Sequence, residues 1–214
     1  MADVLGLVPV LGRESMCAAH FNGRELFWSA VDTLTEVANP PVMLVSGSGL
    51  ELRSAVLRSP TVLDMVECPR RLARLRSAIE ATDLVVVHDP LCPLVSAAFI
   101  RRLLRQVANG RALVGVRPVV DTVKTTLDGS VSGTVNRDEY RIVASPLVCA
   151  GADLLRVPDL AVALTDLSVL VDDLRRLGEV ELVVAPSASR RIEDDSGLSL
   201  LASVDAVTHR VRER

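Results

Sequence analysis

The sequence alternates short runs of β-branched apolar residues with stretches of helical periodicity, and no other feature constrains the fold as strongly. The clearest run, at 83–87, is a continuous apolar segment bounded by polar residues, typical of a strand covered on both sheet faces. Comparable runs lie at 4–8, 41–45, 112–116 and 181–184, and helical patterns lie at 26–38, 69–79, 99–107 and 167–177. This order predicts an α/β fold, with a mostly parallel sheet and helices on both of its faces.

Other segments are less regular. We also predict a short strand at 62–66, a return to the sheet at 142–145, helical turns around Asp153 and a closing helix at 198–212. Between 120 and 135, two alternating segments flank Asp128-Gly129, a dipeptide that favours tight hairpin turns. We therefore predict a β-hairpin arm over 117–141 within a single domain that spans 1–214. Because an inserted arm of this kind often serves another subunit, we also predict a homodimer.

The composition excludes several classes of protein. With 49% hydrophobic residues and a formal charge of -3, the chain does not have the composition of a disordered protein. Only 2% of the residues are aromatic, which argues against a stacking platform for single-stranded nucleic acid. The four cysteines form no C-x-x-C pair, which predicts buried free thiols in a reducing compartment. With no signal peptide or bilayer span visible, we expect a cytoplasmic protein without nucleic-acid or membrane partners.

Ligands of an open parallel sheet bind beyond the carboxyl ends of the strands, so the segments after the strands are the candidate sites. After the first strand, Gly12 suits a turn whose backbone N–H groups contact a phosphate; the alternative is an ordinary turn between a strand and a helix. After the strand at 83–87, Asp89 is placed to hold Mg²⁺ on nucleotide phosphates; the alternative is a carboxylate that caps the loop.

The arm is a third candidate site. Thr122 and Lys124 on its first segment are paired with Thr134 and Arg137 on its second, and these hydroxyls and cations suit a phosphate clamp. The alternative is a solvated hairpin in which the cross-strand pairs only stabilise the turn. Lys124 is the only lysine among 24 basic residues, so chemistry that needs an ammonium group has a single candidate.

Motifs in these three regions occur in the order and at the spacing of a known family. They are Val85-Val-Val-His88-Asp89-Pro-Leu-Cys-Pro93, Val116-Arg-Pro-Val-Val-Asp121-Thr122-Val-Lys124, Thr134-Val-Asn-Arg137 and Ser145-Pro146, with Leu7-Val-Pro9, Gly12 and Thr165-Asp166-Leu-Ser168 outside this centre. In these residues the chain resembles 2-C-methyl-D-erythritol 4-phosphate cytidylyltransferase of the non-mevalonate isoprenoid pathway. The resemblance covers essentially the whole chain and is dense from about Asp83 to Pro146.

The resemblance implies a Rossmann-like nucleotidyltransferase fold and a homodimer joined through the arm. Enzymes of this family use Mg²⁺ to join CTP to a sugar-alcohol phosphate, whose phosphate attacks the α-phosphorus and expels pyrophosphate. Carried over by position, the nucleotide-binding residues are Pro9, Val10, Leu11, Gly12, Arg71 and Asp89, with Asp89 also the metal ligand. The substrate-binding residues are Thr122, Lys124 and Arg137. The residues with a catalytic role are Arg13, Arg137, which reaches across the dimer, and Arg191.

The chain departs from the family's motifs in its charged groups. The loop after Gly12 contains no lysine and adds Glu14, Cys92 stands where the family has an arginine, and Ala188 stands where it has a second metal-binding aspartate. Loss of one electrostatic contact costs roughly 3–4 kcal/mol of transition-state stabilisation. Two hypotheses therefore stand. The chain is a divergent cytidylyltransferase, or it is a catalytically impaired paralogue that binds a phosphorylated ligand or acts as a dimeric scaffold.

Overall fold

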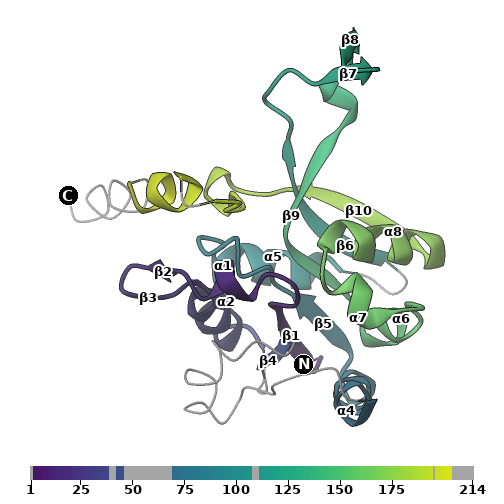
Figure 1. Ribbon diagram of the computed structural model, residues 1–214. Helices are drawn as coiled ribbons and strands as arrows, with labels where there is room; N and C mark the ends of the chain where they lie inside the picture. Colours follow the sequence, from purple (N-terminus) through teal and green to yellow (C-terminus); the bar gives the residue numbers. More distant parts are fainter. Residues whose placement is uncertain (1, 39–41, 46–68, 108–110, 195, 204–214) are drawn as a thin grey trace.

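The computed structural model describes residues 2–38, 42–45, 69–107, 111–194 and 196–203 (Figure 1). A six-stranded sheet in the order β10-β6-β9-β5-β1-β4 forms its centre. The strands are β1 (Val4–Pro9), β4 (Val42–Val45), β5 (Leu84–Val87), β6 (Arg111–Pro118), β9 (Arg141–Ala150) and β10 (Glu179–Val184). All neighbours pair in parallel except β9, which is antiparallel to both β5 and β6. The predicted α/β fold with a mostly parallel sheet is confirmed.

Helices cover both faces of the sheet. They are α1 (Glu14–Cys17), α2 (Leu26–Thr35), α4 (Pro69–Glu80), α5 (Ala97–Gln106), α6 (Gly151–Leu155), α7 (Leu160–Ala163) and α8 (Leu167–Leu177). Successive strand residues point to opposite faces. Val86 therefore packs in one core cluster with α2 and α5, whereas Val85 and Val87 pack in the other with α4 and α6 to α8. Burial on both faces explains why β5 has so continuous an apolar sequence.

Some sequence predictions differ from the structure at the ends of elements. The return strand is longer than predicted, because β9 continues from the predicted 142–145 segment to Ala150. A small hairpin of β2 (His20–Phe21) and β3 (Arg24–Glu25) was not predicted, although its Asn22-Gly23 turn with positive φ angles is a recognised signal. The closing helix is present over 196–203, and its remainder lies outside the described residues, as does the predicted strand at 62–66.

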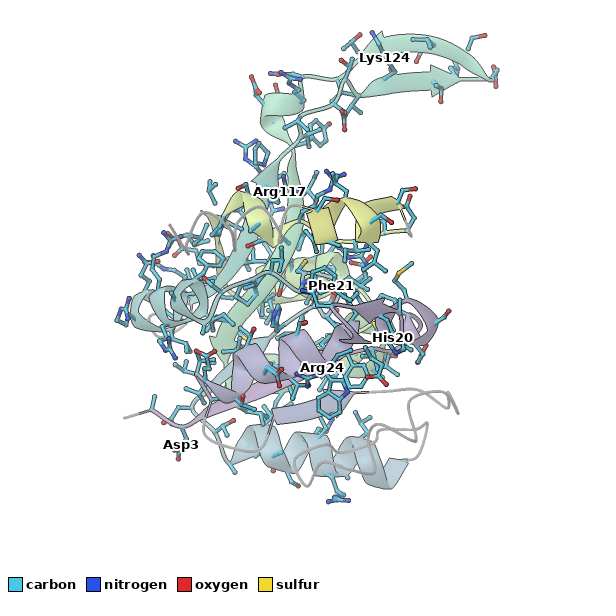
Figure 2. The ribbon with its side chains drawn as sticks, turned by 90° about the vertical axis from the view of Figure 1, so that its left-hand side faces the viewer. Asp3, His20, Phe21, Arg24, Arg117 and Lys124 are labelled. Carbon is cyan, nitrogen blue, oxygen red and sulfur yellow. The ribbon has the colours of Figure 1, made fainter. Side chains whose placement is uncertain are left out.

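The arm leaves the sheet at the end of β6 and returns at the start of β9 (Figure 1). Its hairpin consists of β7 (Lys124–Leu127) and β8 (Ser130–Thr134), joined at Asp128-Gly129, where both residues have positive φ. Figure 2 shows Lys124 out on the hairpin, away from Arg117 at the base of the arm. Nearly every residue of the hairpin is exposed, so the arm makes little contact with the rest of its own chain.

The sheet topology defines where a ligand can bind. Strand β1 lies between β5 and β4, so the chain connections reverse direction at the boundary of β1 and β5. Loops after these strands diverge there and leave a crevice at their carboxyl ends.

None of the helices in the described ranges is long and apolar enough to cross a bilayer.

A substitution at Gly151, at the start of α6, tests how closely this helix packs against the backbone of residues 79–82. A Cβ atom at this position would lie 2.8 Å from the backbone oxygens of both Ile79 and Thr82. We expect Gly151→Ala to lower the free energy of unfolding by about 1–3 kcal/mol, because two backbone segments must move. Urea unfolding measures the change. In the control Gly197→Ala, the nearest atom is a side-chain oxygen of Asp194 at 3.3 Å, and we expect a change within about 0.5 kcal/mol. Equal effects of the two substitutions would contradict the packing.

Candidate functional site

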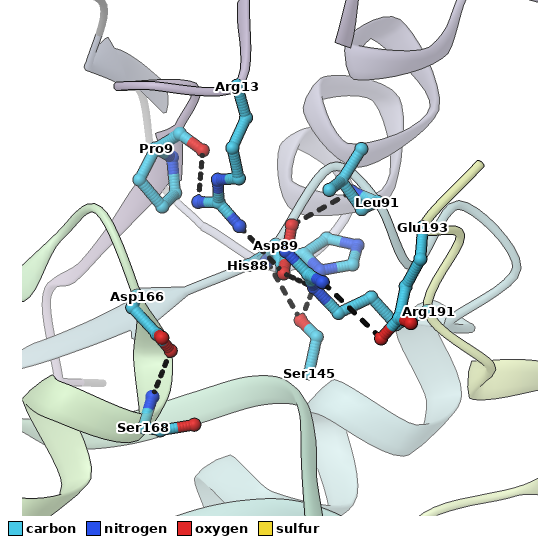
Figure 3. Close-up of polar contacts among 10 residues, drawn as sticks. All are labelled: Pro9, Arg13, His88, Asp89, Leu91, Ser145, Asp166, Ser168, Arg191 and Glu193. Atoms are coloured by element: carbon cyan, nitrogen blue, oxygen red, sulfur yellow. Dashed lines mark hydrogen bonds and ion pairs between the residues drawn. The ribbon is translucent and has the colours of Figure 1, made fainter. Parts of the chain in front are cut away.

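Three segments beyond the carboxyl ends of strands meet at one carboxylate (Figure 3). Arg13 follows β1, Asp89 follows β5, and Arg191 follows β10. The Oδ2 atom of Asp89 accepts hydrogen bonds from Nη1 of Arg13 and from Nε of Arg191, both at 2.9 Å. The Asp89 side chain is only 4% exposed. Two guanidinium groups therefore share a single buried acid.

The position of Asp89 is fixed by its own loop and by β9. Its Oδ1 atom accepts a hydrogen bond from the backbone N–H of Leu91 at 2.9 Å. Its backbone N–H donates to Oγ of Ser145, a buried residue of β9, at 3.0 Å. Because residues 147–150 of β9 pair with the whole of β5, the sheet itself holds the carboxylate in place.

His88 is a buried neutral group beside this acid. Its Nδ1 atom lies 2.5 Å from Oγ of Ser145, and its Nε2 atom has no partner among the described residues. Burial lowers the pKa of His88 to about 4, and the opposing effect of the Asp89 charge is smaller. The imidazole therefore adds no positive charge to the site near neutral pH.

The nearby cysteines are also neutral. Burial raises the pKa of Cys17 to about 12 and also raises the pKa of Cys92. A thiol must ionise to act as a nucleophile, so neither is suited to covalent catalysis. These two and Cys149 are free and buried in the structure, as predicted, and Cys68 lies outside the described residues.

Gly12 forms the predicted turn after β1, with a φ of 70°. Arg13 closes this turn, because its backbone N–H donates to the Val10 carbonyl and its Nη2 donates to the Pro9 carbonyl, both at 3.0 Å. The backbone N–H of Gly12 donates to Oε1 of Glu14 at 3.1 Å. The chain's own carboxylate thus takes the N–H group that we predicted for a phosphate.

Three cavities adjoin the Asp89 cluster: one of about 520 Å³ contains Arg191 without Arg13, and the other two are lined by both arginines. The first of these two, of about 480 Å³, is lined by Gly12, Arg13, Glu14, Ser15, Met16, Leu91, Arg191 and Glu193. The second, of about 400 Å³, is lined by Arg13, Asp89, Arg141, Ile142, Val143, Asp166, Leu167, Ser168, Arg191 and Glu193. Both volumes lie in the range of small-molecule sites. Since the two cavities share Arg13, Arg191 and Glu193, they form two compartments on either side of one charged boundary.

Some predicted site residues come together here and others do not. Gly12, Arg13, Asp89 and Arg191 line these cavities, whereas Val10 is part of the core and Leu11 packs against it. The side chain of Arg71 lies outside the described part of the structure.

The arm residues lie elsewhere within one chain. Lys124 Nζ donates to Thr134 Oγ1 at 2.6 Å, and Arg137 Nη1 donates to the Val120 carbonyl at 2.5 Å. Together with Thr122, they line neither cavity. The expectation of one cleft shared by Gly12, Asp89 and Thr122 is therefore not met within a single chain.

Sequence reasoning missed Arg141, which lines the second cavity from the first residue of β9. Its Nη1 atom donates to the carbonyls of Asp138 and Tyr140, both at 2.7 Å. The signal was weak, because arginine supplies all but one of the basic residues and appears on many surfaces. Its position where the arm rejoins the sheet is the only local clue.

The residues around Asp89 do not fit the expected magnesium site. Both carboxylate oxygens already accept hydrogen bonds, and two of the three donors are cations. In the described part of the chain, no group of three or more His, Cys, Asp or Glu residues is arranged to hold a metal ion. Mg²⁺ needs near-octahedral oxygen ligands, and a carboxylate already shared by two guanidinium groups is a poor one.

Comparisons with known proteins show which family the chain matches. Residues 22–183 match the sequence model of 2-C-methyl-D-erythritol 4-phosphate cytidylyltransferase. The enzyme of that name from Halorhodospira halophila is 29% identical over 194 residues, which cover 87% of this chain and 73% of that protein. A bifunctional enzyme IspD/IspF from Gluconobacter oxydans is 31% identical over 108 residues, which cover 50% of this chain and only 27% of that longer protein.

The fold is shared with solved structures. The crystal structure of the cytidylyltransferase from Thermus thermophilus has a TM-score of 0.71 at 24% identity and covers 95% of this chain and 98% of that one. The synthase from Anaerococcus prevotii has a TM-score of 0.70 at 18% identity, with the same coverage. Because the family model matches well over half of its residues, this chain belongs to the 2-C-methyl-D-erythritol 4-phosphate cytidylyltransferase family.

Proposed function

We propose that the chain transfers a cytidylyl group from CTP to 2-C-methyl-D-erythritol 4-phosphate and releases pyrophosphate. Family membership supports the reaction class. The observation that carries the proposal is that two cavities of the size of small-molecule sites meet at Arg13 and Arg191. The relatives are named as enzymes, which gives no support to the alternative of a paralogue without turnover.

Each cavity suits one substrate. The first lies along the Gly12 turn and takes the phosphates of CTP, which approach the backbone there. The second contains the guanidinium of Arg141 and the hydroxyl of Ser168, which suit a phosphate and the hydroxyls of a sugar alcohol. The α-phosphorus of CTP then lies at the boundary between the two cavities, within reach of the sugar-alcohol phosphate.

The reaction needs no side-chain base. The attacking group is a phosphate oxygen that is already ionised, so it forms the new bond to the α-phosphorus while the bond to the leaving pyrophosphate oxygen breaks. Arg13 and Arg191 stabilise the negative charge that builds up on the α-phosphate oxygens. The neutral His88 and the protonated thiols of Cys17 and Cys92 have no step to perform.

We further propose that two chains pair through their arms. Val120, Leu127 and Val131 are all at least 64% exposed, which is unfavourable for apolar side chains on a projecting hairpin. A second copy that covers them removes this surface from water. Pairing also brings Thr122, Lys124 and Arg137 to the partner's sugar-phosphate cavity, which accounts for their distance from the site in their own chain.

Pyrophosphate release from CTP, measured with and without the sugar-alcohol phosphate, tests the proposed reaction. We expect release that depends on both substrates, and we expect Arg13→Gln to lower kcat by about 100-fold or more, because one transition-state contact is lost. The control Arg24→Gln breaks an exposed ion pair with Asp32 and a cation–π contact with Trp28, lines neither cavity, and is expected to retain activity. Binding of CTP without any release would favour the impaired paralogue, and an undiminished kcat in Arg13→Gln would contradict the assigned role.

Glu14 tests the use of the Gly12 turn by phosphate. We expect Glu14→Gln to bind CTP about tenfold more tightly, because a competing negative charge leaves the Gly12 N–H. Isothermal titration calorimetry measures the affinity. Glu36→Gln, which breaks an exposed ion pair with Arg101, is the matched control. Unchanged or weaker CTP binding by Glu14→Gln would place the phosphates elsewhere.

The arm is tested by the oligomeric state in solution. We expect the wild-type protein to be a dimer in light scattering, and Leu127→Asp with Val131→Asp to be a folded monomer, because carboxylates cannot be buried in an apolar contact. Val162→Asp, at a side chain of α7 that is 53% exposed, is the control and should stay dimeric. A wild-type monomer at micromolar concentration would refute the arm-mediated dimer.

A further inference from the structure

We infer that Asp89 acts as a positioning residue for Arg13 and Arg191, and that this arginine pair binds the nucleotide phosphates without a protein-bound metal ion. The inference rests on the proposed function for the identity of the nucleotide, and it concerns how the site supplies positive charge. It follows from three features of the cluster: the hydrogen bonds that Asp89 already accepts, the terminal nitrogens of Arg191, and the carboxylates that stand where an anion would bind.

Asp89 has little capacity left for a cation. Its Oδ2 atom accepts from Arg13 and Arg191, and its Oδ1 atom accepts from the backbone of Leu91. A magnesium ion at Oδ2 would have to displace a guanidinium group. Arg13 is only 12% exposed, so it would then lie buried without its counter-charge, which is among the costliest arrangements in a protein. The acid therefore serves the two arginines.

The arginines keep donors for a ligand. Arg191 binds Asp89 through Nε alone, and its two terminal nitrogens form no hydrogen bond to the described residues. Nη1 lies 3.7 Å from Oε1 of Glu193. Arg13 is used at both terminal nitrogens, but its buried Nε has no partner in the described part of the chain. Arg191 is thus the residue that donates hydrogen bonds to a phosphate, and Arg13 adds a fixed positive charge beside it.

Two carboxylates stand where phosphate oxygens would bind. Glu193 lies beside the terminal nitrogen of Arg191, and its side chain is 74% exposed, so it can swing into solvent at little cost. Glu14 takes the Gly12 N–H. Both residues line the first cavity. A phosphate that enters takes the place of these carboxylates at Arg191 and at the Gly12 N–H, and this exchange needs no divalent cation on Asp89.

Calorimetric titration of the full chain with CTP and with inorganic tripolyphosphate tests the inference. We expect both to bind in EDTA at least as tightly as in excess Mg²⁺, because the free polyphosphate carries more negative charge than its magnesium complex. Binding that appears only with Mg²⁺ would overturn the inference. Turnover with Mg²⁺ but no binding in EDTA leaves the proposed function standing, whereas binding in EDTA without any turnover leaves the inference and removes the function.

Variants of the cluster distinguish whether Asp89 positions the two arginines or binds a metal ion. We expect Asp89→Asn and Arg191→Gln each to weaken tripolyphosphate binding in EDTA about tenfold or more, since a charge-assisted contact is lost or misplaced. If Asp89 were a metal ligand, Asp89→Asn would bind the anion more tightly in EDTA and lose affinity only in Mg²⁺. Tighter binding in EDTA therefore contradicts the inference.

Thermal unfolding, measured beside each titration, separates misfolding from loss of the site. If Asp89→Asn does not fold, the test rests on Arg191→Gln, whose side chain is 31% exposed. Arg24→Gln is the matched control, because it removes one arginine from an exposed ion pair and should bind tripolyphosphate as the wild type does. Equal binding by Arg191→Gln and Arg24→Gln would overturn the inference.

Discussion

A single carboxylate oxygen, Oδ2 of Asp89, joins the segments that follow β1, β5 and β10. Two guanidinium groups this close together repel each other, and the acid between them makes the arrangement tolerable in a buried place. Together with Asp89 the pair carries one net positive charge, and the carboxylate of Glu193 lies at the same boundary of the two cavities. Phosphoryl and nucleotidyl transfer depend mainly on positioning and on neutralising charge, so this one shared contact accounts for most of what the proposed reaction requires of the protein.

The antiparallel strand β9 connects this cluster to the rest of the molecule. Its Ser145 hydroxyl accepts the N–H of Asp89, and its first residue, Arg141, reaches the second cavity. The same strand continues directly from the arm. A single strand therefore connects the site with the arm through which we propose that two chains pair.

The sequence predicted the sheet well because burial on both faces leaves a continuous apolar run, as in β5, and few other structures produce one. It also placed Gly12, Arg13 and Asp89, since motifs at strand ends carry their position with them, and it placed Arg191 by its register with the family. It could not predict that Arg13 and Arg191 both bind Oδ2 of Asp89, because that depends on a contact between residues 102 positions apart. Likewise, the contact of Glu14 with Gly12 is a choice of rotamer that no pattern encodes.

The most direct test of the account is a crystal structure of the protein with CTP bound. The account predicts phosphate oxygens within hydrogen-bond distance of a terminal nitrogen of Arg191 and of the Gly12 N–H, with Asp89 still bonded to both arginines and the side chains of Glu14 and Glu193 turned away. A triphosphate bound outside the two cavities, or a magnesium ion on Asp89 with Arg13 or Arg191 released, would contradict it.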